Sequence, residues 1–125
     1  MSMPIYRAKK IDSDEWVEGY LSYDREYEVN RIVVVHKSGK FKTSVHSFDP
    51  STLAIHFDGM VDKDGKKIFA GLSEDGKGGD VLNCRGKDYY ARMHQTGIIE
   101  IVDNEKVCSV LLHYAEQLEI IGVRG

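Results

Sequence analysis

The residues of this sequence most suited to holding a ligand are basic and aromatic. The basic ones fall on the first expected strand and around a later hairpin: Arg7, Lys9, Lys10, Lys37, Lys40 and Lys42. Tyr6, Phe41, Tyr89 and Tyr90 supply aromatic rings in similar segments. Small barrels bind single-stranded nucleic acid through such cationic groups and stacking rings. We therefore interpret the six residues as a basic patch, with nucleic acid as one candidate partner.

A purely structural role for these lysines is the alternative. Lysine on a strand edge blocks edge-to-edge aggregation and keeps a β-protein soluble. The chain carries 17 Lys and Arg against 20 Asp and Glu, which gives a formal net charge of −3. Because this charge provides no global attraction for phosphate groups, the composition favours the structural role.

Four aromatic side chains are crowded into twelve residues and form a second candidate site. They are Trp16, Tyr20, Tyr23 and Tyr27. Trp and Tyr are enriched at protein interfaces, so these residues predict an interaction surface and a homo-oligomer. The alternative, which the sequence leaves open, is a single aromatic cluster in the core of the monomer.

Patterns for catalysis and metal binding are weak. The five histidines are His36, His46, His56, His94 and His113. Their spacing does not favour local zinc chelation, and no serine lies in a Gly-x-Ser-x-Gly turn. We therefore expect no enzyme, no cofactor and no metal. A deep pocket lined by two or more histidines would instead favour a small-molecule enzyme.

Two segments rich in Asp and Gly match ligand loops only in part. If Gly65 takes the sixth position of a calcium loop, Gly71 takes the twelfth, where a carboxylate is needed. The stretch Asp62 to Gly65 therefore predicts a tight turn in which an Asp side chain bonds the backbone. The run 76–79 lacks the Gly-Lys-Ser/Thr ending of a phosphate loop. We expect a flexible loop over 70–78, with little to bury.

The elements that carry these residues are expected to be strands. Val and Ile total 22 residues against 12 for Leu and Ala, and β-branched side chains suit a pleated surface. The expected strands are Ile5–Lys9, Trp16–Tyr23, Glu26–His36, Phe41–Val45, Leu53–Phe57, Gly79–Leu82, Tyr89–Met93, Ile98–Val102, Lys106–Leu112 and Glu119–Val123. The clearest hairpin is Arg31 to Val45. Apolar spacing in Val110 to Leu118 predicts one short helical turn.

Several short motifs occur in a fixed order along most of the chain. They are Tyr6-Arg7-Ala8, Trp16-Val17-Glu18-Gly19, Phe57, Asp58-Gly59-Met60, Asp62-Lys63-Asp64-Gly65-Lys66-Lys67, Ile68-Phe69, Gly79-Asp80-Val81 and Leu118-Glu119-Ile120-Ile121-Gly122. In type and order they resemble the YopX-like family of small phage and prophage proteins. One departure is the stretch Ala70 to Gly78, which we interpret as an inserted loop.

Composition, periodicity and this resemblance together give the expected architecture. We expect a mainly β protein of small antiparallel sheets, with an SH3-like barrel in the C-terminal half and at most one or two short helices. The whole chain, 1–125, forms one YopX-like domain. Its sub-regions are the N-terminal strands and hairpin at about 1–58 and the barrel-like part at about 59–125.

The resemblance implies a non-enzymatic phage- or prophage-type binding or assembly module, whose partner is a phage or host protein. A nucleic-acid-associated accessory protein of a phage is the alternative, and a small-molecule enzyme is a further one. The longest uninterrupted apolar run has four residues, Ile32 to Val35, which predicts no membrane association. We place the protein in the cytoplasm of a bacterial host.

Overall fold

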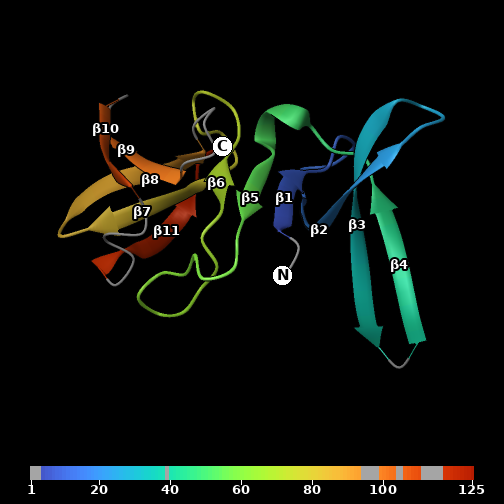
Figure 1. Ribbon diagram of the computed structural model, residues 1–125, viewed down its shortest axis with the longest axis horizontal. Coiled ribbons are helices and arrows are strands. Elements are labelled where there is room, and N and C mark those ends of the chain that lie inside the picture. Colours follow the sequence, from blue (N-terminus) through green and yellow to red (C-terminus); the bar gives the residue numbers. More distant parts are fainter. Residues whose placement is uncertain (1–3, 39, 94–98, 104–105, 111–116) are drawn as a thin grey trace.

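The computed structural model describes residues 4–38, 40–93, 99–103, 106–110 and 117–125, and gives the backbone alone for 35–38, 40–42 and 106–110 (Figure 1). Its elements are β1 (Ile5–Lys9), β2 (Trp16–Asp24), β3 (Val29–Ser38), β4 (Lys40–His46), the 3-10 helix η1 (Pro50–Thr52), β5 (Ala54–His56), β6 (Ala70–Gly71), β7 (Asp80–Cys84), β8 (Lys87–Met93), β9 (Ile99–Asp103), β10 (Lys106–Val110) and β11 (Glu119–Val123). The predicted mainly β fold is confirmed. The helical turn expected over 110–118 falls mostly outside the described residues.

The strands join into one continuous sheet whose order is β10-β9-β8-β6-β5-β1-β2-β3-β4, with β11 and β7 branching from β8. All pairs are antiparallel except β6 with β8, which meet in parallel at Gly71 and Arg92. β9 pairs with one edge of β8, while β7 and β6 share the other edge in succession. β8 therefore connects the C-terminal strands to the N-terminal half.

The SH3-like barrel expected in the C-terminal half is not closed by the strands that the structure describes. β10 pairs with β9, and β11 pairs with β7, but no described pair joins β10 to β11. Part of one edge of β8 pairs with β6. The sheet therefore continues into the N-terminal half instead of closing into a barrel.

The strands β2, β3 and β4 form an arm that extends away from the rest of the molecule (Figure 1). The predicted hairpin is confirmed, with register running from Ile32 opposite His46 to Ser38 opposite Lys40. Ile32 is fully buried on one face of the arm. Val33 lies on the other face, beside the exposed Val45, so the run Ile32–Val35 is not covered equally on both sides.

Two apolar clusters form the core. One gathers buried side chains of the C-terminal half, among them Ile68, Leu82 and Leu118. The other lies where β1 meets the arm and gathers Ala8, Val17, Ile32 and Phe48. The half-buried Tyr6 packs against both clusters. β1 therefore holds the two halves together through apolar contact as well as through the sheet.

The expectation that 70–78 has little to bury is wrong. Ala70 and Gly71 form β6, and Gly76 and Gly78 are buried as well. A Cβ atom added at Gly78 would lie 1.9 Å from the carbonyl oxygen of Thr52. A Cβ atom at Gly76 would lie 2.5 Å from the ring of Tyr90. Close packing requires glycine at these positions. From the sequence alone, such glycines cannot be distinguished from those of a flexible linker.

This packing predicts unequal costs for alanine at two glycines that have the same positive φ angle. Gly78 and Gly59 both have φ of +87°, but a Cβ atom at Gly59 would meet nothing within 4 Å. Gly59→Ala should cost about 1 kcal/mol of unfolding free energy, from backbone strain alone. Gly78→Ala should cost more than about 3 kcal/mol, because backbone atoms of the η1 segment block the methyl group.

Urea unfolding followed by the fluorescence of the single tryptophan measures both losses. Equal losses in the two variants would show that the 70–78 segment does not pack as described.

Candidate functional site

Arg7 does not belong to an exposed basic patch. Its guanidinium group lies between two rings, with its carbon 5.6 Å from the centroid of Trp16 and 4.4 Å from that of Phe69. One terminal nitrogen donates hydrogen bonds of 2.8 Å to Oδ1 of Asp80 and to the carbonyl oxygen of Gly78. The side chains of Arg7 and Asp80 are only 13% and 2% exposed. Arg7 is thus committed to an internal ion pair.

The other oxygen of Asp80 is also engaged. Oδ2 accepts a hydrogen bond of 2.8 Å from the backbone N–H of Phe69. Burial raises the pKa of Asp80 above its ordinary value of 3.8, while the Arg7 charge and the Phe69 N–H oppose this shift. Sequence reasoning missed this pair. The signal was available, since Arg7 and Asp80 both lie in motifs used for the family resemblance.

Asp62 is a second structural carboxylate, in the segment predicted to be a tight turn. Its Oδ1 accepts hydrogen bonds of 2.9 Å from the N–H groups of Asp64 and Lys66, and Gly65 has a φ of +81°. The predicted turn is therefore confirmed. Oδ2 also accepts from the N–H of Ile120 at 3.2 Å, which fixes the start of β11.

The pKa of Asp62 reflects these contacts. Burial opposes ionisation of Asp62, but the N–H donors of Lys66, Ile120 and Asp64 outweigh it and lower the pKa of the carboxyl below 3.8. The charged form of Asp62 therefore stabilises the fold.

The remaining basic residues separate into two places. Lys9 and Lys10 lie at the end of β1 and line a pocket of about 390 Å³. Lys37, Lys40 and Lys42 occupy the far end of the arm in the backbone register, and their side chains fall outside the described part of the chain. With Arg7 buried, the six predicted residues do not form one patch.

The pocket beside Lys9 and Lys10 brings together residues from both predicted sites. Trp16 lines it, and Nζ of Lys9 lies 5.9 Å from the Trp16 ring centroid. The other lining residues come from the β1–β2 turn, η1, the 72–79 segment and the chain end: Ile11, Ser13, Asp14, Asp49, Pro50, Thr52, Lys77 and Gly125.

The four predicted aromatic residues do not form a single core cluster. Trp16 is half-buried against Arg7, whereas Tyr20, Tyr23 and Tyr27 are 39%, 57% and 65% exposed. Trp16 and Tyr20 lie on one face of β2, and Tyr23 lies on the other. Tyr27 follows β2 in a turn, where its ring lies 5.7 Å from the guanidinium carbon of Arg31.

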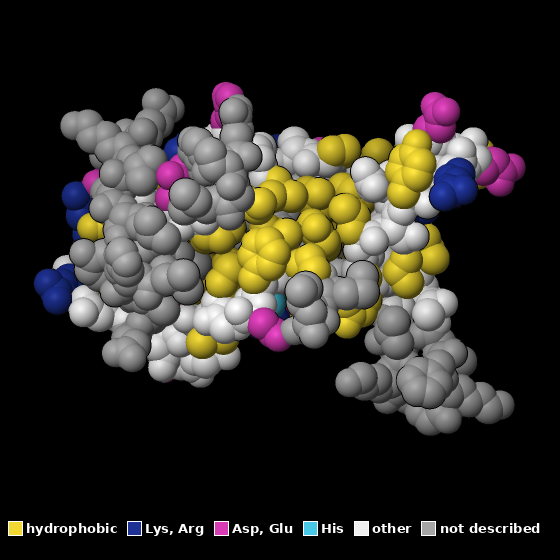
Figure 2. Space-filling model, viewed as in Figure 1, with side chains coloured by type: hydrophobic (Ala, Val, Ile, Leu, Met, Phe, Trp, Pro, Cys, Tyr) yellow, Lys and Arg dark blue, Asp and Glu magenta, His cyan; other side chains and the backbone are white. Residues whose placement is uncertain are grey.

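One face of the arm carries an apolar row across three strands. Tyr20 stands directly opposite Val33, and Val33 directly opposite Val45. Val45 is 56% exposed although it lies in a strand. Val29, on the same face of β3, is exposed as well. Figure 2 shows a further gathering of apolar side chains over β1, β5 and β6, in the middle of the molecule.

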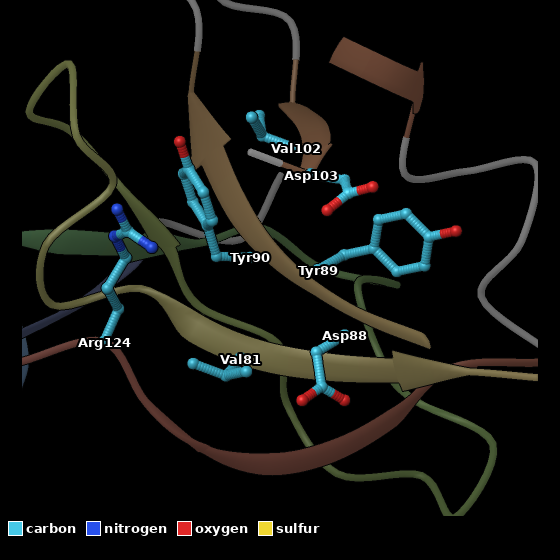
Figure 3. Close-up of a pocket in the computed structure, with 7 residues that line it drawn as sticks. All are labelled: Val81, Asp88, Tyr89, Tyr90, Val102, Asp103 and Arg124. Atoms are coloured by element: carbon cyan, nitrogen blue, oxygen red, sulfur yellow. The ribbon is translucent and has the colours of Figure 1, made fainter. Parts of the chain in front are cut away.

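A second pocket, of about 460 Å³, lies on the C-terminal half (Figure 3). The guanidinium carbon of Arg124 lies 3.8 Å from the ring centroid of Tyr90, at one side of the pocket. Asp103 and Tyr89 lie on the other side, and Asp103 is paired with Lys87 at 2.6 Å. Asp88 accepts a hydrogen bond of 3.0 Å from the side chain of Asn83.

The described histidines do not converge. Nδ1 of the buried His56 lies 3.1 Å from the carbonyl oxygen of Ile68, and Nε2 of His46 lies 2.9 Å from Oγ of Ser44. Neither of the two pockets described above contains a histidine. Within the described residues, no three His, Cys, Asp or Glu side chains are grouped to hold a metal ion. The side chains of His36, His94 and His113 fall outside that part.

Comparison with protein-family models, with curated proteins and with solved structures found no match for this chain. The resemblance to the YopX-like family therefore stays a prediction from the quoted motifs. No helix in the described ranges is long and apolar enough to cross a membrane.

The buried ion pair predicts a pH-dependent loss of stability when Arg7 is removed. Arg7→Met leaves the Asp80 charge unpaired in the interior and should cost about 3 to 5 kcal/mol at pH 7. Without Arg7 the pKa of Asp80 rises further above 3.8, so the folded variant binds a proton more readily than the unfolded chain. The loss should therefore shrink as the pH falls towards 4.

The matched control for Arg7→Met is Arg31→Met, since the pair of Arg31 with Asp24 at 3.3 Å is more exposed. That change should cost about 1 kcal/mol or less. Urea unfolding at several pH values checks both variants. A loss for Arg7→Met that is small, or that does not vary with pH, would contradict the described pair.

Asp62→Asn should have a distinct pH profile. Because the folded-state pKa of Asp62 is lowered, its charge stabilises the protein above pH 3.8, and this contribution is lost as the pH falls through the lowered value. The variant should lose about 1 to 2 kcal/mol at pH 7 and less at pH 3. Chemical unfolding at the two pH values measures this difference, and an equal loss at both would refute the proposed role of the charge.

Proposed function

We propose that this chain is a non-enzymatic binding or assembly module that docks a protein partner on its β2–β3–β4 arm. The observation that carries the proposal is the row formed by Tyr20, Val33 and Val45 on one face of the arm. On the opposite face of the same strands, Val17 and Ile32 belong to a buried apolar cluster. The arm is thus covered around Val17 and Ile32 on one side, whereas the row of Tyr20, Val33 and Val45 on the other side is open.

The open face has the chemistry of an interface. Burial of an apolar side chain that starts exposed contributes about 1.5 to 3 kcal/mol, and Tyr adds a hydroxyl group that can bond to a partner. Tyr20 and Val45 both begin substantially exposed. A partner that covers this row would therefore gain favourable free energy without unfolding any part of the arm.

The edge of the arm offers a second means of attachment. β4 ends the strand order, and its outer edge has no strand partner among the described residues. An extended segment of a partner can add to such an edge through main-chain hydrogen bonds. The added strand would lie next to Val45, so strand addition and coverage of the apolar row support one another.

The YopX-like resemblance supplies the biological setting of the proposal. It favours a phage or host protein as the partner, in the cytoplasm of a bacterium, and a homo-oligomer is a special case in which a second copy covers the arm. Nucleic acid is less well supported than a protein partner, because Arg7 is buried and the remaining predicted cations lie at two separate places.

The test compares two exposed apolar residues in different halves. Val45→Lys places a charge on the arm, whereas Ile121→Lys places the same charge on β11, where the residue is 52% exposed. We expect both variants to fold. Binding of a captured host or phage protein, or self-association measured by sedimentation, should fall at least about tenfold for Val45→Lys only.

Equal binding by the two variants would contradict the proposed role of the arm. So would an unmodified protein that remains monomeric and retains no partner from the host or its phages.

A further inference from the structure

The pocket on the C-terminal half contains an arginine that is stacked on a ring but has no carboxylate partner (Figure 3). The guanidinium carbon of Arg124 lies 3.8 Å from the ring centroid of Tyr90. We propose that this pocket binds a small zwitterion of the α-amino acid type, whose carboxylate pairs with Arg124 and whose ammonium group pairs with Asp88. The proposal is independent of the arm, because none of the lining residues lies on β2, β3 or β4.

Backbone bonds and close packing fix the arginine and its ring. The N–H of Arg124 donates to the carbonyl oxygen of Gly79 at 2.8 Å, and its carbonyl oxygen accepts from the N–H of Gly78 at 2.6 Å. Tyr90 is only 6% exposed, and a Cβ atom added at Gly76 would lie 2.5 Å from its ring. The stacked guanidinium group therefore rests on an anchored backbone and a packed ring.

The N–H edge of this guanidinium group is open. Stacking uses the flat face of the group and leaves the donors in its plane available. The side chain of Arg124 forms no ion pair and no hydrogen bond with the residues that the structure describes. A ligand carboxylate can therefore accept two parallel hydrogen bonds from this edge.

The acid whose charge acts on Arg124 is already bonded elsewhere. Oδ1 of Asp75 accepts from Oγ of Ser73 at 2.7 Å and from the N–H of Lys77 at 3.0 Å. These two bonds lower the pKa of Asp75, and the charge of Arg124 adds to the shift. Asp75 is thus ionised and bonded within its own turn, and it does not occupy the N–H edge of Arg124.

A carboxylate lies on the same face of the sheet as the Tyr90 ring. Asp88 precedes Tyr90 by two residues on β8, so the two side chains leave the same face about 7 Å apart. The side-chain amide of Asn83 donates to Oδ1 of Asp88 at 3.0 Å. Oδ2 of Asp88 accepts no hydrogen bond within the described ranges, and the residue is exposed.

The two open groups carry opposite charges, which decides the class of ligand. An anion that pairs with Arg124 would be repelled by Asp88, and a cation that pairs with Asp88 would be repelled by Arg124. A zwitterion matches both groups. The other acid of the pocket, Asp103, already pairs with Lys87 at 2.6 Å.

The space between the charged groups suits a small apolar side chain. The pocket has a volume of about 460 Å³, within the range of about 300 to 1,000 Å³ that small-molecule sites occupy. Val81 stands directly opposite Tyr90 in the sheet, and Val102 is opposite it on the other side. Val81 and Tyr89 are half-buried, so a ligand would cover part of their apolar surface.

Amide NMR titration of the full chain tests this proposal with three probes of matched shape. They are L-leucine, 3-methylbutylamine, which lacks the carboxylate, and 4-methylpentanoate, which lacks the ammonium group. L-Leucine should give saturable shifts at the amides of Val81, Asp88, Tyr90 and Arg124, with half-saturation at about millimolar concentration. Each singly charged probe should need a concentration at least about tenfold higher, because one charge of the pocket stays unmatched.

Two variants separate the two charges. Arg124→Met should weaken the binding of L-leucine at least about tenfold without weakening that of 3-methylbutylamine. Asp88→Asn should weaken the binding of L-leucine without weakening that of 4-methylpentanoate. The control is Arg25→Met, at an exposed arginine between β2 and β3, which should leave the binding of L-leucine unchanged.

Three results would overturn the proposal. One is a set of shifts that do not saturate with L-leucine. Another is a singly charged probe that binds as tightly as L-leucine. The third is a variant at Arg124 or Asp88 that loses all three probes alike, or none of them.

Discussion

The structure depends on one buried ion pair, between Arg7 of β1 and Asp80 of β7. These residues are 73 positions apart, and their contact joins the N-terminal strands to the C-terminal half. The pair also fixes its surroundings, since Arg7 stacks on Trp16 and Phe69 and bonds the carbonyl of Gly78, while Asp80 holds the N–H of Phe69. A buried charge left without its partner is costly, so the halves are constrained to one arrangement.

The position of the pair accounts for the surface that we assign to partner binding. The rings of Trp16 and Phe69 pack on the Arg7 guanidinium group and shield the pair from solvent. Tyr20, further along β2, is not covered in this way. The arm beyond the pair is left with one open apolar face.

Local patterns were sufficient to predict most of the strands but not the contacts between distant segments. The bounds of Ile5–Lys9 and Glu119–Val123 agree with the prediction, because strand alternation and turn residues are local signals. β6 was not predicted because a strand of only two residues, the second of them glycine, is too short to show an alternating pattern of side chains. The prediction of one basic patch was wrong because a sequence does not show that Arg7 has a buried partner. For the same reason, the packing of the Gly-rich segment against Thr52 was not predicted.

Native-state amide hydrogen exchange tests most directly the claim that the Arg7–Asp80 pair makes one cooperative unit of the two halves. The informative amides are those of β1, and that of Phe69, which donates to Asp80. If the account is correct, these amides open with one common free energy close to that of global unfolding, and they lose protection together when Arg7 is replaced. If β1 instead exchanges at a much lower free energy than Phe69 in the unmodified protein, the halves are independent and the account is contradicted.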